Sequence, residues 1–81
     1  MNKLQELLII TMEECGELIQ ECSKAIRTNK YKKNGSLQEE IGDVLCMIEL
    51  MKDNKLITGR ELKNQVELKN LKLMKWSNLL D

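Results

Sequence analysis

Six carboxylates stand in two short stretches of the sequence, EECGE at residues 13–17 and EEIGD at residues 39–43. Each stretch has two adjacent acids, two uncharged residues and a third acid. Because an α-helix turns by about 100° per residue, acids three positions apart lie on the same side of it. The two expected pairs are Glu14 with Glu17 and Glu40 with Asp43. If two helices pack side by side, these four side chains meet in a small volume that suits Mg²⁺.

A solvated helix face is the simpler explanation for either stretch alone. Here, however, like charges three or four positions apart accumulate, and each such pair destabilises an isolated helix by about 0.2–0.5 kcal/mol. A bound divalent cation would reverse that repulsion. Oxygen ligands suit Mg²⁺, for which Mn²⁺ may substitute. The sequence has no histidine, which argues against a di-iron bundle, and its three cysteines form no C-x-x-C motif for zinc.

The composition fits one small domain, residues 1–81. A core of this size stabilises weakly, so we expect oligomerisation. Acidic and basic residues balance at 13 each, and no helix has a clustered basic face, so a nucleic-acid partner is not expected. With no long apolar run and no signal peptide, we expect a cytoplasmic protein without membrane contact. Cys15 and Cys22, two helical turns apart, are expected to fill the core as thiols.

The pattern of apolar residues predicts an all-α fold of three helices, because every long segment repeats with a period near 3.6 and proline is absent. The first helix is expected from Lys3 to Arg27. The second begins with Ser36 as N-cap and Glu39 three residues later, the spacing of a capping box, and ends near residues 53–54. Thr58 and Glu61 repeat that spacing and start a third helix, which runs close to the C-terminus.

The apolar residues of each helix predict which face is buried. The expected core stripe of the first helix is Leu4, Leu7, Leu8, Thr11, Cys15, Leu18, Cys22, Ala25 and Ile26, and that of the second is Leu37, Ile41, Val44, Leu45, Ile48 and Met51. Both acidic pairs are expected at the border between core and solvent. The third helix carries two opposite apolar rows: Leu62, Val66, Leu73, Trp76 and Leu80, and then Leu68, Leu71 and Leu79. We therefore expect a helical bundle that is completed by a homodimer or homotetramer.

The two acidic stretches and their flanking residues resemble the MazG-like family of all-α nucleoside triphosphate pyrophosphohydrolases. That family has E-E-x-x-E, a spacer, and then E-x-x-D; here residues 18–39 form a spacer of 22 residues. The flanking residues Gly16 and Leu18, and Gly42 with Val44 and Leu45, match as well. The resemblance implies cleavage of an NTP or dNTP to the monophosphate and pyrophosphate, with Mg²⁺ as cofactor.

The resemblance also implies roles for individual residues. Glu14, Glu17, Glu40 and Asp43 match the metal-binding acids, and Glu13 and Glu39 match the leading acids, which hold a further metal or a water or help to activate that water. Asn70 and Lys72 match the start of a phosphate-binding motif, but Lys75 and Trp76 stand where its arginine is expected, so Lys75 or Lys69 would have to substitute.

Base recognition is left to the two aromatic residues, Trp76 and Tyr31, although a tryptophan on an apolar helix face is more often part of a core. The alternative function is a non-catalytic helical module that joins chains or binds nucleotide without turnover.

Overall fold

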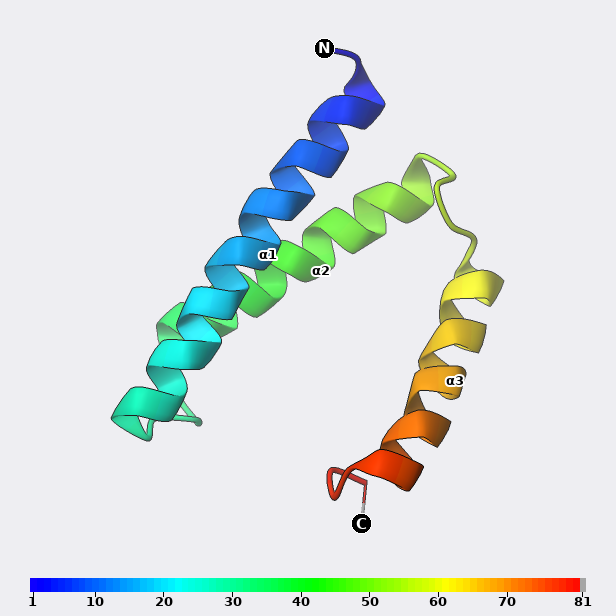
Figure 1. Ribbon diagram of the computed structural model, residues 1–81. Coiled ribbons are helices and arrows are strands. Elements are labelled where there is room, and N and C mark those ends of the chain that lie inside the picture. The colour runs from blue at the N-terminus through cyan, green and yellow to red at the C-terminus, as the bar shows by residue number, and fades with distance from the viewer. Residues whose placement is uncertain (81) are drawn as a thin grey trace.

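The computed structural model describes residues 1–80 and consists of three α-helices, with no strand among those residues (Figure 1). The helices are α1 (Lys3–Thr28), α2 (Gly35–Asp53) and α3 (Gly59–Trp76). The predicted all-α class and the number of helices are confirmed. Each predicted boundary agrees with the structure to within a few residues.

Both ends of the first helix are capped by hydrogen bonds from residues that are close in sequence. The Asn2 side chain accepts a hydrogen bond from the Gln5 backbone at 2.8 Å, and the Gln5 side chain accepts one from the Asn2 backbone at 3.0 Å. At the other end Asn29 adopts the left-handed conformation with φ of 55°, and Lys30 N–H donates to the Ala25 carbonyl at 3.0 Å. This termination reverses the chain, so that α2 runs antiparallel to α1.

The α1–α2 hairpin has the only extensive packing between helices in the described part of the chain. The residues of α1 that lose most solvent exposure recur every three or four positions: Leu7, Ile10, Thr11, Glu14, Leu18, Glu21 and Ala25. On α2 the corresponding residues are Leu37, Glu40, Asp43, Val44, Met47, Ile48 and Met51. We call this contact the seam. Alternating steps of three and four residues are the spacing of helices that pack along their length.

The predicted core stripes were wrong in their orientation. Cys15 and Cys22 are exposed thiols rather than core residues. Ile26 is 68% exposed and Leu45 is 54% exposed, although both were placed in a core stripe. The centre of each apolar stripe was taken as the contact face, whereas the helices meet along one flank of it. That rotation carries Glu14 and Glu40 from the expected border into the seam itself.

The N-terminus of α2 is capped by Asn34 and not by Ser36. The Asn34 side chain accepts a hydrogen bond from the Leu37 backbone at 3.1 Å, and the helix begins at Gly35. Asparagine is as good an N-cap as serine. The helix therefore starts two residues earlier than predicted, and Ser36 lies in its first turn. The predicted start of α3 is confirmed, because Thr58 and Glu61 form a reciprocal capping box at 3.1 Å in each direction.

The third helix stands beside the hairpin rather than on it (Figure 1). It has no buried residue: Leu62 and Leu73 are half-buried, while Val66, Leu68 and Leu71 are each more than half exposed. The radius of gyration is 14.9 Å, against about 12 Å for a compact domain of this length. Within residues 1–80, one apolar row of α3 is only partly covered, at Leu62 and Leu73, and the other row is exposed.

Within residues 1–80, no helix is both long enough and apolar enough to cross a bilayer.

The position of the α2 cap gives a test of the fold. Replacing Asn34 by alanine removes the acceptor for the Leu37 N–H, so we expect the free energy of unfolding to fall by about 1 kcal/mol. The matched change Ser36→Ala should leave it within about 0.5 kcal/mol, as expected of a surface position. Urea denaturation followed by circular dichroism measures both. A larger loss of unfolding free energy for Ser36→Ala than for Asn34→Ala would contradict the assignment of Asn34 as the N-cap and favour Ser36.

Candidate metal centre

Four carboxylates converge at the middle of the seam: Glu14 and Glu17 from α1, and Glu40 and Asp43 from α2. One oxygen of each side chain can be chosen so that all four lie within 4.8 Å of one another. Glu17 is exposed and the other three are half-buried. The spacing of three residues places each pair on one side of its helix, and the antiparallel packing brings the two pairs together.

Two of the carboxylate oxygens in this cluster are buried without a hydrogen-bond partner. They are Oε2 of Glu14 and Oε2 of Glu40. A buried polar atom without a partner costs free energy, and a charged one costs more. Their burial follows from the seam positions of these residues. The hairpin therefore holds two acceptor atoms that lack a positive or hydrogen-bearing partner among residues 1–80.

The surroundings of Glu40 and Glu14 disfavour the ionised form of these two side chains when no cation is present. Burial raises the pKa of Glu40 to about 7, and the neighbouring carboxylates Glu17 and Asp43 add to the shift. Burial also raises the pKa of Glu14, with further contributions from Glu17 and Asp43. Like charges that share a site cannot all ionise without a counter-charge. Ionisation of Glu14 and Glu40 is therefore opposed both by burial and by the neighbouring carboxylates.

The residues present fit a divalent cation. The donor set is entirely oxygen, which Mg²⁺ and Mn²⁺ prefer. Oxygens on opposite sides of Mg²⁺ lie about 4.2 Å apart, so a spread of 4.8 Å needs side-chain movements of less than an ångström. A cation there would give both orphaned oxygens a partner and offset the repulsion among the acids.

The two leading acids, Glu13 and Glu39, flank this cluster without joining it. Each precedes a cluster residue on its helix, and each side chain is exposed. They are thus turned by about 100° from Glu14 and Glu40 toward solvent. Both carboxylates therefore lie on the solvent side of the cluster, where a ligand would approach it.

The four residues expected to bind phosphate lie on α3, which does not pack extensively on the hairpin. They are Lys69, Asn70, Lys72 and Lys75, and all are exposed. Lys75 instead lies over the Trp76 ring, with Nζ 5.3 Å from the ring centroid. The structure brings the four cluster acids together, but it does not bring these residues to them.

The two aromatic residues are also away from a core. Trp76 is 78% exposed at the end of α3, and Tyr31 is 57% exposed in the loop between α1 and α2. The prevailing expectation that Trp76 packs inside the chain was wrong. Both rings are thus exposed, and Lys75 lies over one face of the Trp76 ring.

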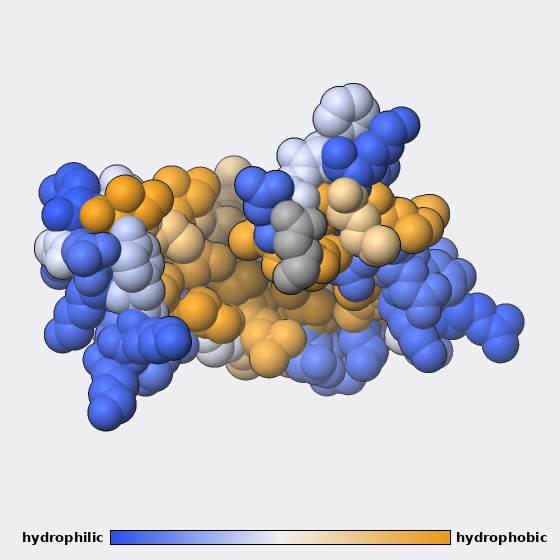
Figure 2. Space-filling view, turned by 90° about the horizontal axis from the view of Figure 1, so that it is seen from below, coloured by the Kyte–Doolittle hydropathy of each residue, from blue (hydrophilic) through white to orange (hydrophobic). Residues whose placement is uncertain are grey.

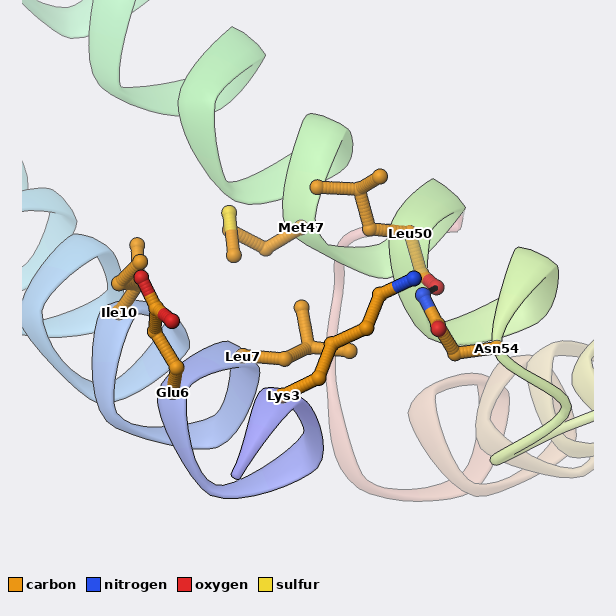
Figure 3. A pocket seen from close by; sticks show the side chains of 7 residues that line it. All are labelled: Lys3, Glu6, Leu7, Ile10, Met47, Leu50 and Asn54. Atoms are coloured by element: carbon orange, nitrogen blue, oxygen red, sulfur yellow. Dashed lines mark hydrogen bonds between the residues drawn. The ribbon is translucent and has the colours of Figure 1, made fainter. Parts of the chain in front are cut away.

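A separate cavity opens farther along the seam, between the start of α1 and the end of α2 (Figure 3). It has a volume of about 260 Å³, and its lining is mostly apolar: Leu7, Ile10, Met47 and Leu50, with Lys3, Glu6 and Asn54. Ile10 lies one helical turn before Glu14, and Met47 lies one turn after Asp43. This cavity could not be predicted from the sequence, because it depends on how the end of α2 packs against the start of α1.

A comparison with known protein families identifies the family of this chain. Residues 2–57 match the family model of the MazG nucleotide pyrophosphohydrolase domain. The chain belongs to the MazG family. The matched segment covers more than half of the chain and contains the whole hairpin with all six motif acids, so the resemblance inferred from the motifs is confirmed. No curated protein and no solved structure matches the chain.

The match ends at residue 57, just before α3 begins. In this MazG protein the family sequence therefore coincides with the hairpin that carries the acids. The departure from the expected phosphate motif falls on α3, outside the matched residues.

The raised pKa of Glu40 predicts how the stability of the metal-free MazG protein depends on pH. The folded protein binds the Glu40 proton more tightly than the unfolded chain, whose ordinary pKa is 4.5. Stability is therefore greatest below pH 4.5 on this account, and it falls as the pH rises from 4.5 through 7. We expect the melting temperature in EDTA to decrease over that window.

The control is Glu40→Gln, which removes the titrating group and should flatten the profile. Mg²⁺ should raise the melting temperature of the wild type most at pH 7–8, where the acids are ionised. Differential scanning fluorimetry measures both effects. Equal pH profiles for wild type and Glu40→Gln would contradict the assigned burial of this carboxylate.

Proposed function

We propose that this MazG protein is a Mg²⁺-dependent pyrophosphohydrolase that cleaves an NTP or dNTP to the monophosphate and pyrophosphate. The observation that carries the proposal is the cluster of four carboxylates with two orphaned buried oxygens. The family match supports the reaction class. Nucleotide substrates suit a cytoplasmic protein, and removal of noncanonical nucleotides or adjustment of nucleotide pools is the role we assign.

Within this proposal the cluster acids hold the cation. Glu14, Glu17, Glu40 and Asp43 would supply its protein ligands, and Glu17 is the exposed member of this set. When bound, Mg²⁺ neutralises charge on the phosphates and lowers the pKa of the attacking water. Occupancy also removes the reason for Glu40 to keep its proton, so its carboxylate is ionised in the active form.

The exposed acids Glu13 and Glu39 have the second role. A water oxygen joins the α-phosphorus, the bond from that phosphorus to the bridging oxygen breaks, and pyrophosphate leaves. One of these two carboxylates accepts the proton that the water loses. Positioning and charge stabilisation supply most of the rate, because phosphoryl transfer needs little covalent help from the protein.

The rest of the substrate is assigned to α3 and the hairpin loop. Lys72 and Asn70, with Lys75 or Lys69 in place of the missing arginine, bind the phosphates once α3 comes close to a cluster. Trp76 or Tyr31 stacks on the base, since both rings are exposed. The active assembly is a homodimer or homotetramer on this proposal.

A nucleotide-binding module without turnover is the second candidate. The observation in its favour is the separation of the α3 lysines from the acids in a single chain. Such a module would bind nucleotide and Mg²⁺ but release no product.

The activity test is pyrophosphate release with Mg²⁺ and with EDTA. Glu17→Ala and Asp43→Ala should each lower the rate by more than about 100-fold, since each removes charge at the reacting centre. Their helical content should stay close to that of the wild type, because neither side chain contributes apolar packing. Release of monophosphate and pyrophosphate identifies the reaction.

The matched control is Glu49→Gln. It removes a carboxylate from α2 outside the cluster, where Glu49 makes only an exposed ion pair with Lys52 at 3.6 Å. We expect wild-type activity from this variant. Full activity in Glu17→Ala or Asp43→Ala would remove the proposed metal site, and nucleotide binding without product would favour the second candidate.

A further inference from the structure

The acidic cluster lies between two cavities of different chemistry on the same side of the hairpin. Positions seven residues apart define this side: Ile10, Glu17 and Lys24 on α1, and Leu50, Asp43 and Ser36 on α2. Seven residues are two turns of an α-helix, so the outer positions lie within about 20° of the acid between them. We call this the Glu17 side. Ile10 and Leu50 line the apolar cavity of Figure 3, and Lys24 and Ser36 line a second cavity.

The second cavity opens at the loop end of the hairpin and has a volume of about 170 Å³. Its lining is polar: Glu21, Lys24, Thr28, Lys30, Asn34 and Ser36. Glu21 comes four residues after Glu17, and Ser36 four before Glu40, so the cavity begins about 6 Å along the helix axes from the acids. Figure 2 shows hydrophilic side chains at both ends of the molecule with hydrophobic ones between them, and the hairpin loop lies at one end (Figure 1). We call this second cavity the basic cavity.

The backbone of Lys30 is fixed although this residue lies in a loop. Its N–H donates to the Ala25 carbonyl at 3.0 Å, and its carbonyl accepts from Nδ2 of Asn34 at 2.8 Å. The same Asn34 side chain accepts from the Leu37 N–H at 3.1 Å, which ties Lys30 to the start of α2. Lys24 is part of α1. Both lysines are thus held at the basic cavity by hydrogen-bonded backbone.

The two lysines of the basic cavity have no carboxylate partner. Within residues 1–80 the one ion pair joins Lys52 to Glu49, and the only acid that lines this cavity is Glu21. Two positive charges against one negative leave the cavity positive. Ammonium groups and a serine hydroxyl donate hydrogen bonds to phosphate oxygens. The basic cavity therefore suits a phosphate group, one helical turn from the proposed cation.

We propose that the basic cavity holds the outer phosphates of the substrate, and that Lys24 and Lys30 contact the pyrophosphate that leaves. This inference rests on the proposed function and gives the substrate a direction along the Glu17 side. The nucleoside extends the other way from the cation, toward the apolar cavity of Figure 3. Tyr31 then lies at the phosphate end, beside Lys30, which leaves the base to Trp76 or to the apolar cavity.

The contact also has a role in the reaction. When the bond from the α-phosphorus to the bridging oxygen breaks, its electron pair stays on the pyrophosphate. The charges of Lys24 and Lys30 beside that group stabilise it as it leaves. A single chain supplies this contact, whereas the lysines of α3 contribute only where α3 comes close to a cluster.

The test is the binding of inorganic pyrophosphate in the presence of Mg²⁺, measured by isothermal titration calorimetry. Lys24→Ala with Lys30→Ala should weaken it by at least about tenfold, because the variant removes two charged hydrogen-bond donors. Binding of a nucleoside monophosphate, which lacks the outer phosphates, should be unchanged. The helical circular dichroism should also be unchanged, since both side chains are exposed and unpaired.

Two variants are the controls. Lys32→Ala removes the same charge from the same loop, but Lys32 does not line the basic cavity, so this variant should bind pyrophosphate like the wild type. Lys24→Arg with Lys30→Arg keeps both charges and should retain most of the affinity. A weakening by Lys32→Ala as large as that by Lys24→Ala with Lys30→Ala would assign the effect to the general charge of the loop and overturn the inference.

Binding of pyrophosphate needs no turnover, so this test is independent of the activity test. A protein that hydrolyses nucleotides but binds pyrophosphate equally well with and without the two lysines would overturn the inference and leave the proposed function intact. Equal weakening of pyrophosphate and monophosphate binding would also overturn it. Selective loss of pyrophosphate binding in a protein without turnover would support the basic cavity and contradict the proposed activity.

Discussion

The packing of α1 against α2 buries carboxylates where a helical hairpin would ordinarily bury apolar side chains. Glu14 and Glu40 occupy seam positions, and one oxygen of each is buried without a partner. An apolar residue at either position would stabilise the hairpin more than an unpaired carboxylate does. The two acids therefore lower the stability of the fold, which indicates a role other than packing. A divalent cation bound there would reverse the sign of that contribution. On the proposed function, folding and metal binding would thus be coupled through the same four side chains.

The hairpin has two sides with different chemistry. One carries Glu13, Glu17, Glu39 and Asp43. The other carries exposed apolar residues, among them Met12 and Ile19 of α1 and Ile41 and Leu45 of α2. Among residues 1–80 only Leu7, Ala25 and Met47 are fully buried, so the core of a single chain stabilises the fold weakly. On the proposed function, a cation bound on the acidic side would add to this limited stability.

The sequence predicted the elements of this fold better than their contacts. The period of the apolar residues and the capping box at Thr58 identify three helices, because these signals are local. Ser36 was the wrong cap because Asn34, two residues earlier, competes for the same role. The apolar stripe of α1 was assigned to one contact, although Leu7 and Leu18 lie in the seam while Leu8 and Ile26 are exposed. Periodicity alone reports the average of two such faces.

For the candidate site too, the local features could be predicted from the sequence and the tertiary contacts could not. The spacing of Glu14 with Glu17 and of Glu40 with Asp43 depends only on helix geometry, so their pairing could be predicted. The burial of Glu14 and Glu40 depends on the rotation of each helix, which the packing of Leu7, Ala25 and Met47 decides. The separation of α3 depends on the backbone of Lys55 and Leu56, for which the sequence has no glycine or proline signal.

The central claim is that a divalent cation binds between the two acidic pairs. Mn²⁺ added to isotopically labelled protein broadens the amide signals of nearby residues, so NMR spectroscopy locates the ion directly. The account predicts that the signals of residues 13–17 and 39–43 broaden first, at substoichiometric Mn²⁺, and that excess Mg²⁺ restores them. Broadening that begins elsewhere, or that spreads evenly over all exposed acids, would contradict it.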